Sequence, residues 1–190
     1  MRQYCSSCLY PQKTCLCEHI IRIMNPTAIK ILQHPKEAKH ALNTAHIASL
    51  CLENIDIRSS FLEKNEYEEW LENTALIFPH AHSKPLTKDH RGSLLFIDAT
   101  WPKARAILQY IPTLKNIPCY HLINPPKGEY RIRKASQKIQ LSTIEAIVYA
   151  LSLIENEPSR YQPLLHAFRK RIAMQIEHMG MDVFTKNYLS

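Results

Sequence analysis

The sequence has few glycines, no long apolar run and no apolar leader, and each absence excludes a class of protein. Only three of its 190 residues are glycine, so the chain carries no glycine-rich loop of the kind that cradles nucleotide phosphates. No run approaches the roughly eighteen apolar residues that a membrane-spanning helix needs. The first residues, Met1–Cys5, contain no apolar signal region. We therefore expect a cytoplasmic protein that makes no use of a membrane.

The charge is positive and unevenly spread. The formal net charge is +7, while the hydrophobic fraction of 45% and the charged fraction of 22% are ordinary for a globular protein. Residues 53–72 carry seven carboxylates against Arg58 and Lys64, so the positive excess lies elsewhere. It gathers in residues 127–138 and 169–171. This distribution favours a polyanionic partner, of which nucleic acid is the commonest.

Four of the six cysteines stand close together near the start of the chain, as Cys5, Cys8, Cys15 and Cys17. In a reducing compartment such a cluster indicates a metal site more often than disulfides, although disulfides and an iron–sulfur cluster remain alternatives. Four thiolates suit a tetrahedral structural zinc ion with no open position. We expect a zinc knuckle over residues 1–24 and an α/β domain over residues 25–190.

Apolar runs alternate with helical patterns along the rest of the chain. Because strands that alternate with helices pair in parallel, this order predicts an α/β fold with a parallel or mostly parallel sheet that is covered on both faces. The expected strands are residues 28–32, 75–78, 94–97 and 117–122, and the main expected helices are residues 44–52, 102–110, 141–155 and 159–179.

Reactive side chains follow the most apolar of these strands, which ends in Asp98, Thr100 and Trp101. Ligands of parallel sheets bind beyond the carboxyl ends of the strands. Asp98 is therefore a candidate base, or alternatively a helix cap or an acceptor for backbone amides. Trp101 is a candidate stacking wall, or alternatively a core residue. Ser142 begins a helix, where capping competes with ligand binding as its role.

The ordered set of motifs resembles the DTW-domain family over nearly the whole chain. The resemblance is carried by pieces that appear in the family's order: the cysteine cluster, His34-Pro35-Lys36-Glu37 with Asn43-Thr44, Phe78-Pro79, Asp98-Ala99-Thr100-Trp101, Tyr130-Arg131-Ile132-Arg133 and Leu141-Ser142-Thr143-Ile144-Glu145-Ala146.

The resemblance implies an S-adenosylmethionine-dependent tRNA-uridine aminocarboxypropyltransferase, which moves the 3-amino-3-carboxypropyl group to N3 of a uridine in tRNA. It also implies a SPOUT-like fold with a C-terminal trefoil knot. We expect catalysis at Asp98 and Trp101. The expected cofactor-binding residues are Phe78, Pro79, Asp98, Thr100, Ser142, Thr143 and Glu145, and the expected RNA-binding residues are Lys127, Arg131, Arg133 and Lys134.

Two other functions fit the same sequence. A SPOUT-type RNA methyltransferase keeps the fold and the co-substrate but transfers a methyl group instead, because the carbon beside the sulfonium that faces the nucleophile is the one that reacts. A non-catalytic zinc-knuckle RNA-binding protein needs no co-substrate. The sequence does not decide between a monomer and a homodimer.

Overall fold

The computed structural model describes residues 3–40, 42–61, 64–126, 128 and 141–186. We call residues 3–24, which contain the four clustered cysteines, the cysteine segment. It contains two short 3-10 helices, η1 (Gln12–Thr14) and η2 (Cys17–His19). The strands are β1 (Ile29–Gln33), β2 (Ile55–Ser59), β3 (Thr74–Ile77), β4 (Lys84–Pro85), β5 (Ser93–Asp98) and β6 (Cys119–His121). The helices are α1 (Pro35–Ala38), α2 (Thr44–Cys51), α3 (Lys64–Trp70), α4 (Trp101–Tyr110), η3 (Pro112–Lys115), α5 (Thr143–Glu155), α6 (Gln162–Met179) and α7 (Met181–Phe184).

The six strands form one sheet in the order β2-β1-β5-β3-β6-β4, and every pair of neighbours is parallel. The predicted parallel sheet is therefore confirmed. The sequence reading missed two edge strands. β2 alternates Ile55 and Ile57 with Asp56 and Arg58 inside the acidic stretch, and β4 is two residues long. An edge strand needs no continuous apolar run, because only part of it is covered.

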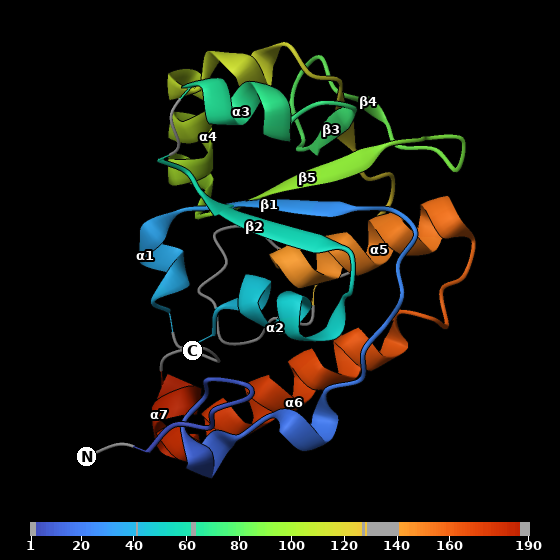
Figure 1. The fold of residues 1–190 in the computed structure, drawn as a ribbon. Coiled ribbons are helices and arrows are strands. Elements are labelled where there is room, and N and C mark those ends of the chain that lie inside the picture. Colours follow the sequence, from blue (N-terminus) through green and yellow to red (C-terminus); the bar gives the residue numbers. More distant parts are fainter. Residues whose placement is uncertain (1–2, 41, 62–63, 127, 129–140, 187–190) are drawn as a thin grey trace.

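Helices cover both faces of the sheet, as predicted. Helices α3 and α4 lie on one face, and α2, α5 and α6 lie on the other (Figure 1). Side chains of a strand alternate between faces, so Leu94 and Phe96 of β5 pack with the second group, whereas Leu95 packs with the first. Each face thus has its own apolar core. Within the described residues, no helix is both long enough and apolar enough to cross a membrane.

The cysteine segment packs against the end of the chain. Cys8 and Leu16 are buried in the same core as Leu164 and Phe168 of α6, and the Arg171 side chain donates to the carbonyl of Thr14 at 3.4 Å. A segment poor in apolar residues gains a hydrophobic cover in this way. The division into residues 1–24 and 25–190 stays a prediction.

Candidate functional site

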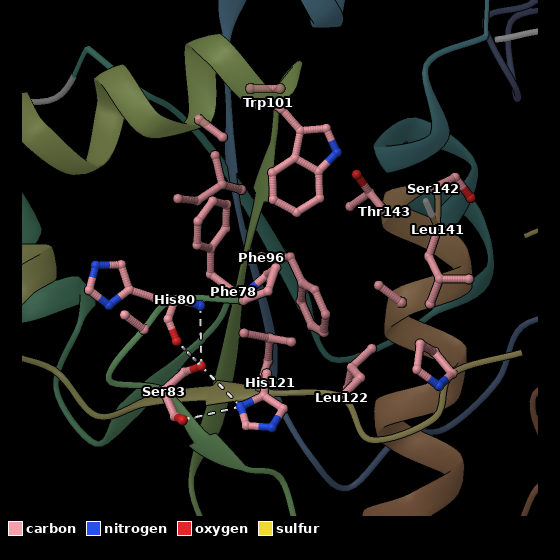
Figure 2. A pocket seen from close by; sticks show the side chains of 18 residues that line it. Phe78, His80, Ser83, Phe96, Trp101, His121, Leu122, Leu141, Ser142 and Thr143 are labelled. Carbon is pink, nitrogen blue, oxygen red and sulfur yellow. Dashed lines mark hydrogen bonds between the residues drawn. The ribbon is translucent and has the colours of Figure 1, made fainter. Parts of the chain in front are cut away.

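A cavity of about 520 Å³ opens beyond the carboxyl ends of β3, β5 and β6, beside the start of α5. This is the edge at which ligands of parallel sheets bind. Apolar side chains dominate its wall, and two histidines are the only ionisable groups among its described lining residues. In Figure 2, Trp101 lies at one end of the cavity, His121 and Ser83 lie at the other, and Thr143 lies to one side. The lining residues are Ile77–Ala81, Ser83, Phe96, Ile97, Ala99, Trp101, Ala104, His121, Leu122, Pro125, Leu141–Thr143 and Ala146.

An aromatic pair separates this cavity from a second one. The rings of Phe78 and Trp101 lie 5.3 Å apart between centroids, at an angle of 51°. Both residues also line a cavity of about 730 Å³, which extends over α4 and η3 and includes Arg105 and Lys115. Trp101 is held in place because it is the first residue of α4, with Pro102 behind it. The pair is thus a shared wall that a ligand can contact from either side.

Asp98 lies behind the cavity wall and joins three elements. Its side chain is buried, and it is absent from the lining residues. The Thr143 hydroxyl donates to Asp98 Oδ1 at 2.7 Å, and Gln33 Nε2 donates to Asp98 Oδ2 at 2.8 Å. Gln33 and Asp98 are partners in the register of β1 and β5. The carboxylate therefore fixes the start of α5 against the ends of two strands.

The orientation of the Gln33 amide is fixed by the cap of α2. Asn43 Oδ1 accepts from the backbone N–H of His46 at 3.0 Å. Because only the oxygen of the Asn43 amide can accept this hydrogen bond, the orientation of that amide is fixed. Gln33 Nε2 donates to the same oxygen at 2.9 Å, so the amine of Gln33 faces both Asn43 and Asp98. Asn43 is thus both the N-cap of α2 and a partner of Gln33.

Ser142 and Glu145 form a capping box at the start of α5. Glu145 Oε2 accepts from the backbone N–H of Ser142 at 2.7 Å and from its hydroxyl at 2.6 Å, and Ser142 Oγ accepts from the N–H of Glu145 at 3.4 Å. The Glu145 carboxylate thus already offsets the positive end of the helix dipole. The capping role is confirmed for Ser142, with Glu145 as its partner, whereas the Thr143 hydroxyl donates to Asp98.

His121 and Ser83 are wall residues that sequence reasoning missed. The Ser83 hydroxyl donates to the carbonyl of His80 at 2.7 Å, and His121 Nδ1 lies 3.0 Å from Ser83 Oγ and 3.2 Å from Ser83 O. Since a carbonyl oxygen only accepts, His121 Nδ1 carries a proton in this contact. No local pattern marks this pair, because its members are 38 positions apart in the sequence.

The structure gathers some predicted site residues at the cavity and not others. Phe78, Pro79, Trp101, Ser142 and Thr143 line it. Asp98, Thr100 and Glu145 are not among the lining residues, although each is next to one in the chain or bonded to one. The predicted RNA-binding residues Lys127, Arg131, Arg133 and Lys134 lie outside the described residues. The roles assigned to all these residues stay predictions.

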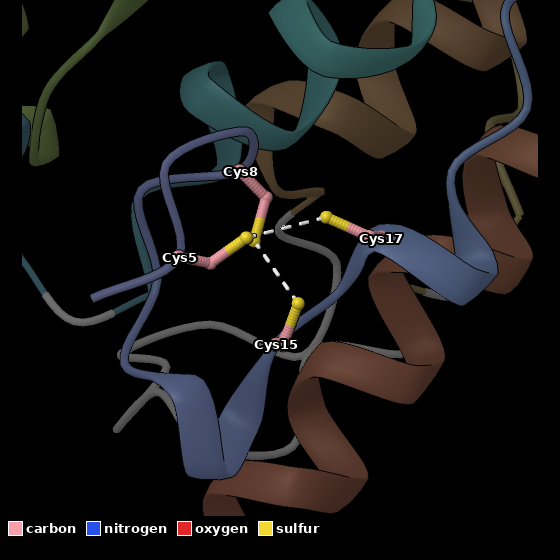
Figure 3. A group of neighbouring side chains, drawn as sticks. All are labelled: Cys5, Cys8, Cys15 and Cys17. Atoms are coloured by element: carbon pink, nitrogen blue, oxygen red, sulfur yellow. Dashed lines mark hydrogen bonds between the residues drawn. The ribbon is translucent and has the colours of Figure 1, made fainter. Parts of the chain in front are cut away.

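The four cysteine sulfurs form a compact group (Figure 3). All lie within 4.8 Å of one another, with Cys5 and Cys17 at 3.5 Å and Cys8 and Cys15 at 3.7 Å. A tetrahedral zinc ion with Zn–S bonds of about 2.3 Å holds its sulfurs about 3.8 Å apart. The residues therefore fit a four-thiolate metal centre.

The electrostatics of the cluster also favour a cation. Hydrogen bonds from the backbone at Cys8 and Ser7 lower the pKa of Cys5 to about 6. The neighbouring thiols of Cys15 and Cys5 raise the pKa of Cys17 to about 12. One thiolate is thus stabilised by the fold, whereas further negative charge is resisted unless a metal ion neutralises it.

Comparisons with known proteins place the whole chain in one group. The family model described as the DTW domain matches residues 2–176. The protein named tRNA-uridine aminocarboxypropyltransferase 2 in Drosophila melanogaster is 28% identical, in a match that covers 99% of this chain and 81% of the fly protein. The protein of the same name in Mus musculus is 27% identical, over 99% of this chain and 68% of its own length. No solved structure matches the chain significantly.

Proposed function

Because the chain belongs to the DTW domain family, we propose that it is a tRNA-uridine aminocarboxypropyltransferase that uses S-adenosylmethionine. The observation that carries this proposal is the match of 99% of the chain to relatives with that name. The proposed reaction moves the 3-amino-3-carboxypropyl group to N3 of a uridine and releases methylthioadenosine. The proposed fold is SPOUT-like with a C-terminal trefoil knot.

The cavity at the ends of β3, β5 and β6 has suitable dimensions and chemistry for S-adenosylmethionine. Its volume of about 520 Å³ falls in the usual range for small-molecule sites, roughly 300–1,000 Å³. Its apolar wall suits the adenine ring, with Trp101 and Phe78 as stacking surfaces. The Thr143 hydroxyl and the backbone of the Pro79 loop offer polar contacts. When bound, S-adenosylmethionine supplies a carbon that is activated by the adjacent sulfonium.

The carboxylate of such a co-substrate needs a partner that the start of α5 does not readily provide. Glu145 already occupies that helix end through its bonds to Ser142. A second carboxylate there would meet like charge. Arg133 is therefore the proposed partner, because a guanidinium binds a carboxylate through two hydrogen bonds.

We assign Asp98 the role of a positioning residue. Its carboxylate holds Thr143 and Gln33 by hydrogen bonds, and its side chain lies behind the wall. The weakly acidic N3–H of uridine must lose its proton during the transfer, so the alternative is that Asp98 is the general base. Asp98→Asn separates the two roles, as developed in the Discussion.

The remaining parts of the proposal concern metal and RNA. Cys5, Cys8, Cys15 and Cys17 hold a structural zinc ion that fastens the first 24 residues. tRNA binds through positive residues, including Lys127, Arg131, Arg133 and Lys134. Trp101 contacts the co-substrate or the uracil ring, since base stacking on an aromatic side chain tolerates either.

The deciding experiment analyses the nucleosides of tRNA after incubation with the purified protein and S-adenosylmethionine. The proposal predicts a uridine that has gained the aminocarboxypropyl group, together with methylthioadenosine. A uridine that has gained only a methyl group, with S-adenosylhomocysteine, identifies the methyltransferase instead. If calorimetry detects no binding of S-adenosylmethionine, both transferase functions are excluded and RNA binding alone remains.

A further inference from the structure

A third cavity, separate from the two described above, lies between the cysteine segment and helices α1, α2 and α6. Its volume is about 1000 Å³, and its described lining residues include no aspartate or glutamate. The basic residues that line it come from three separate parts of the chain. They are Lys13, Lys39, His40, His46, Arg171 and His178. Described walls that carry cations and histidines but no carboxylate side chain create a positive field that attracts an anion.

Arg171 is held in this wall in a fixed orientation. It is 2% exposed, and its guanidinium lies 4.0 Å from the centroid of the Tyr10 ring. One of its nitrogens donates to the Thr14 carbonyl. Stacking and hydrogen bonding fix the plane of the guanidinium. A planar cation held in this way is suited to phosphate oxygens.

The Tyr10 hydroxyl gives a second and independent indication of a ligand. Tyr10 is 7% exposed, and its hydroxyl makes no hydrogen bond with any described residue. A buried hydroxyl without a partner costs free energy, so its presence usually has an explanation. Because Tyr10 lines this cavity, an acceptor bound there satisfies the hydroxyl. A phosphate oxygen is such an acceptor.

The cavity is connected to the candidate active site by three hydrogen bonds. Asn43 lines it, Gln33 joins Asn43 to Asp98, and Thr143 joins Asp98 to the wall of the first cavity. Both cavities therefore lie at the carboxyl edge of the sheet. Because this chain of contacts runs through the ends of β1 and β5, the site proposed below takes phosphate near the nucleotide whose base enters the first cavity.

We propose that the cavity formed by Tyr10, Lys13, Lys39, His46 and Arg171 binds backbone phosphate of the RNA substrate, beside the target nucleotide. This inference rests on the proposed function in that the anion is RNA. It assigns the cysteine segment a part in binding: the metal cluster holds Tyr10 and Lys13 against α6, so that they form one wall of the phosphate site.

The test measures binding of a fluorescently labelled, unmodified tRNA transcript over about 50–200 mM salt. The double variant Lys13→Gln/Lys39→Gln removes two exposed charges from the cavity. The slope of log affinity against log salt is negative, and each lost phosphate contact reduces its magnitude by about one. We therefore expect the magnitude to decrease by about two. The matched control, Lys88→Gln, removes an exposed charge from the β4–β5 connection, which precedes the amino end of β5. It should leave the slope almost unchanged.

Tyr10→Phe tests the hydroxyl without removing the ring. If the hydroxyl binds phosphate, tRNA affinity falls about tenfold, while the midpoint of urea unfolding stays the same or rises. Wild-type affinity and slope in both the double variant and Tyr10→Phe would overturn the proposal, as would an equal decrease in Lys88→Gln. Calorimetry with S-adenosylmethionine is run on every variant. If the unaltered protein does not bind S-adenosylmethionine, the proposed function is refuted. The salt slopes test the phosphate site independently of that result.

Discussion

Replacing Asp98 by asparagine removes the charge of this side chain but retains its shape and its hydrogen bonds to Gln33 and Thr143. The amide of Gln33 cannot exchange its nitrogen and oxygen by rotation, because Nε2 donates to the Asn43 oxygen that caps α2. The new amide therefore presents its oxygen to Gln33 and its nitrogen to Thr143, whose hydroxyl can rotate to accept. We expect Asp98→Asn to fold normally.

The magnitudes distinguish this variant from Asp98→Ala. Alanine leaves the Gln33 amine and the Thr143 hydroxyl without these acceptors, at a cost of about 1–3 kcal/mol for each buried group. Asp98→Ala should therefore lower the free energy of unfolding by about 2–6 kcal/mol, whereas Asp98→Asn should lower it by less than about 1 kcal/mol.

The assay combines urea unfolding with transfer of radiolabel from S-adenosylmethionine to tRNA. If Asp98 is a positioning residue, Asp98→Asn retains kcat within about tenfold and keeps the pH profile of the parent protein, since general-base catalysis contributes roughly 10²–10⁴-fold. A loss of that larger size in a variant of normal stability, with the acid limb of the profile changed, refutes our assignment and makes Asp98 the base.

Three further predictions concern the metal cluster, a helix cap and a partly buried histidine. Cys8→Ser should release the metal, destabilise the first 24 residues and weaken tRNA binding while S-adenosylmethionine binding is largely kept, as measured by metal analysis, anisotropy and calorimetry. Ser142→Ala removes the capping box of α5 and should lower the free energy of unfolding by about 1 kcal/mol in urea. Burial lowers the pKa of His90 below its ordinary value of 6.5, so the unfolded chain binds a proton first as the pH falls. The stability contributed by neutral His90 should therefore be complete above pH 6.5 and decline below it, and His90→Gln should show a shallower decline in urea titrations between pH 5 and 7.5.

The features that were predictable from the sequence depend on residues close together in the chain. The spacing of Cys5, Cys8, Cys15 and Cys17 indicated a metal cluster, and the structure brings their sulfurs together. Ser142 and Glu145 stand three positions apart, and they form the predicted cap. The strand before Asp98 was identifiable because a strand that is covered on both faces of the sheet needs a continuous apolar run.

The features that were not predictable depend on register and packing. Gln33 reaches Asp98 only because β1 pairs with β5 in one register out of several, and no local pattern encodes that pairing. His121 meets Ser83 because β6 lies beside β4. The proposed role of Arg171 could be recognised only from its contact with Tyr10, which is 161 positions earlier in the sequence.

The packing of the cysteine segment on α6 has a consequence for how the protein is made. Synthesis on the ribosome proceeds from the amino end, and segments fold as they emerge. The cysteines are therefore free to collect a metal ion early, but Cys8 and Leu16 are covered only when α6 has been translated, more than 140 residues later. Contacts between such distant segments form slowly. A nascent chain thus carries an uncovered cysteine cluster through most of its synthesis, and truncation before α6 should leave that apolar surface as a target for chaperones and proteases.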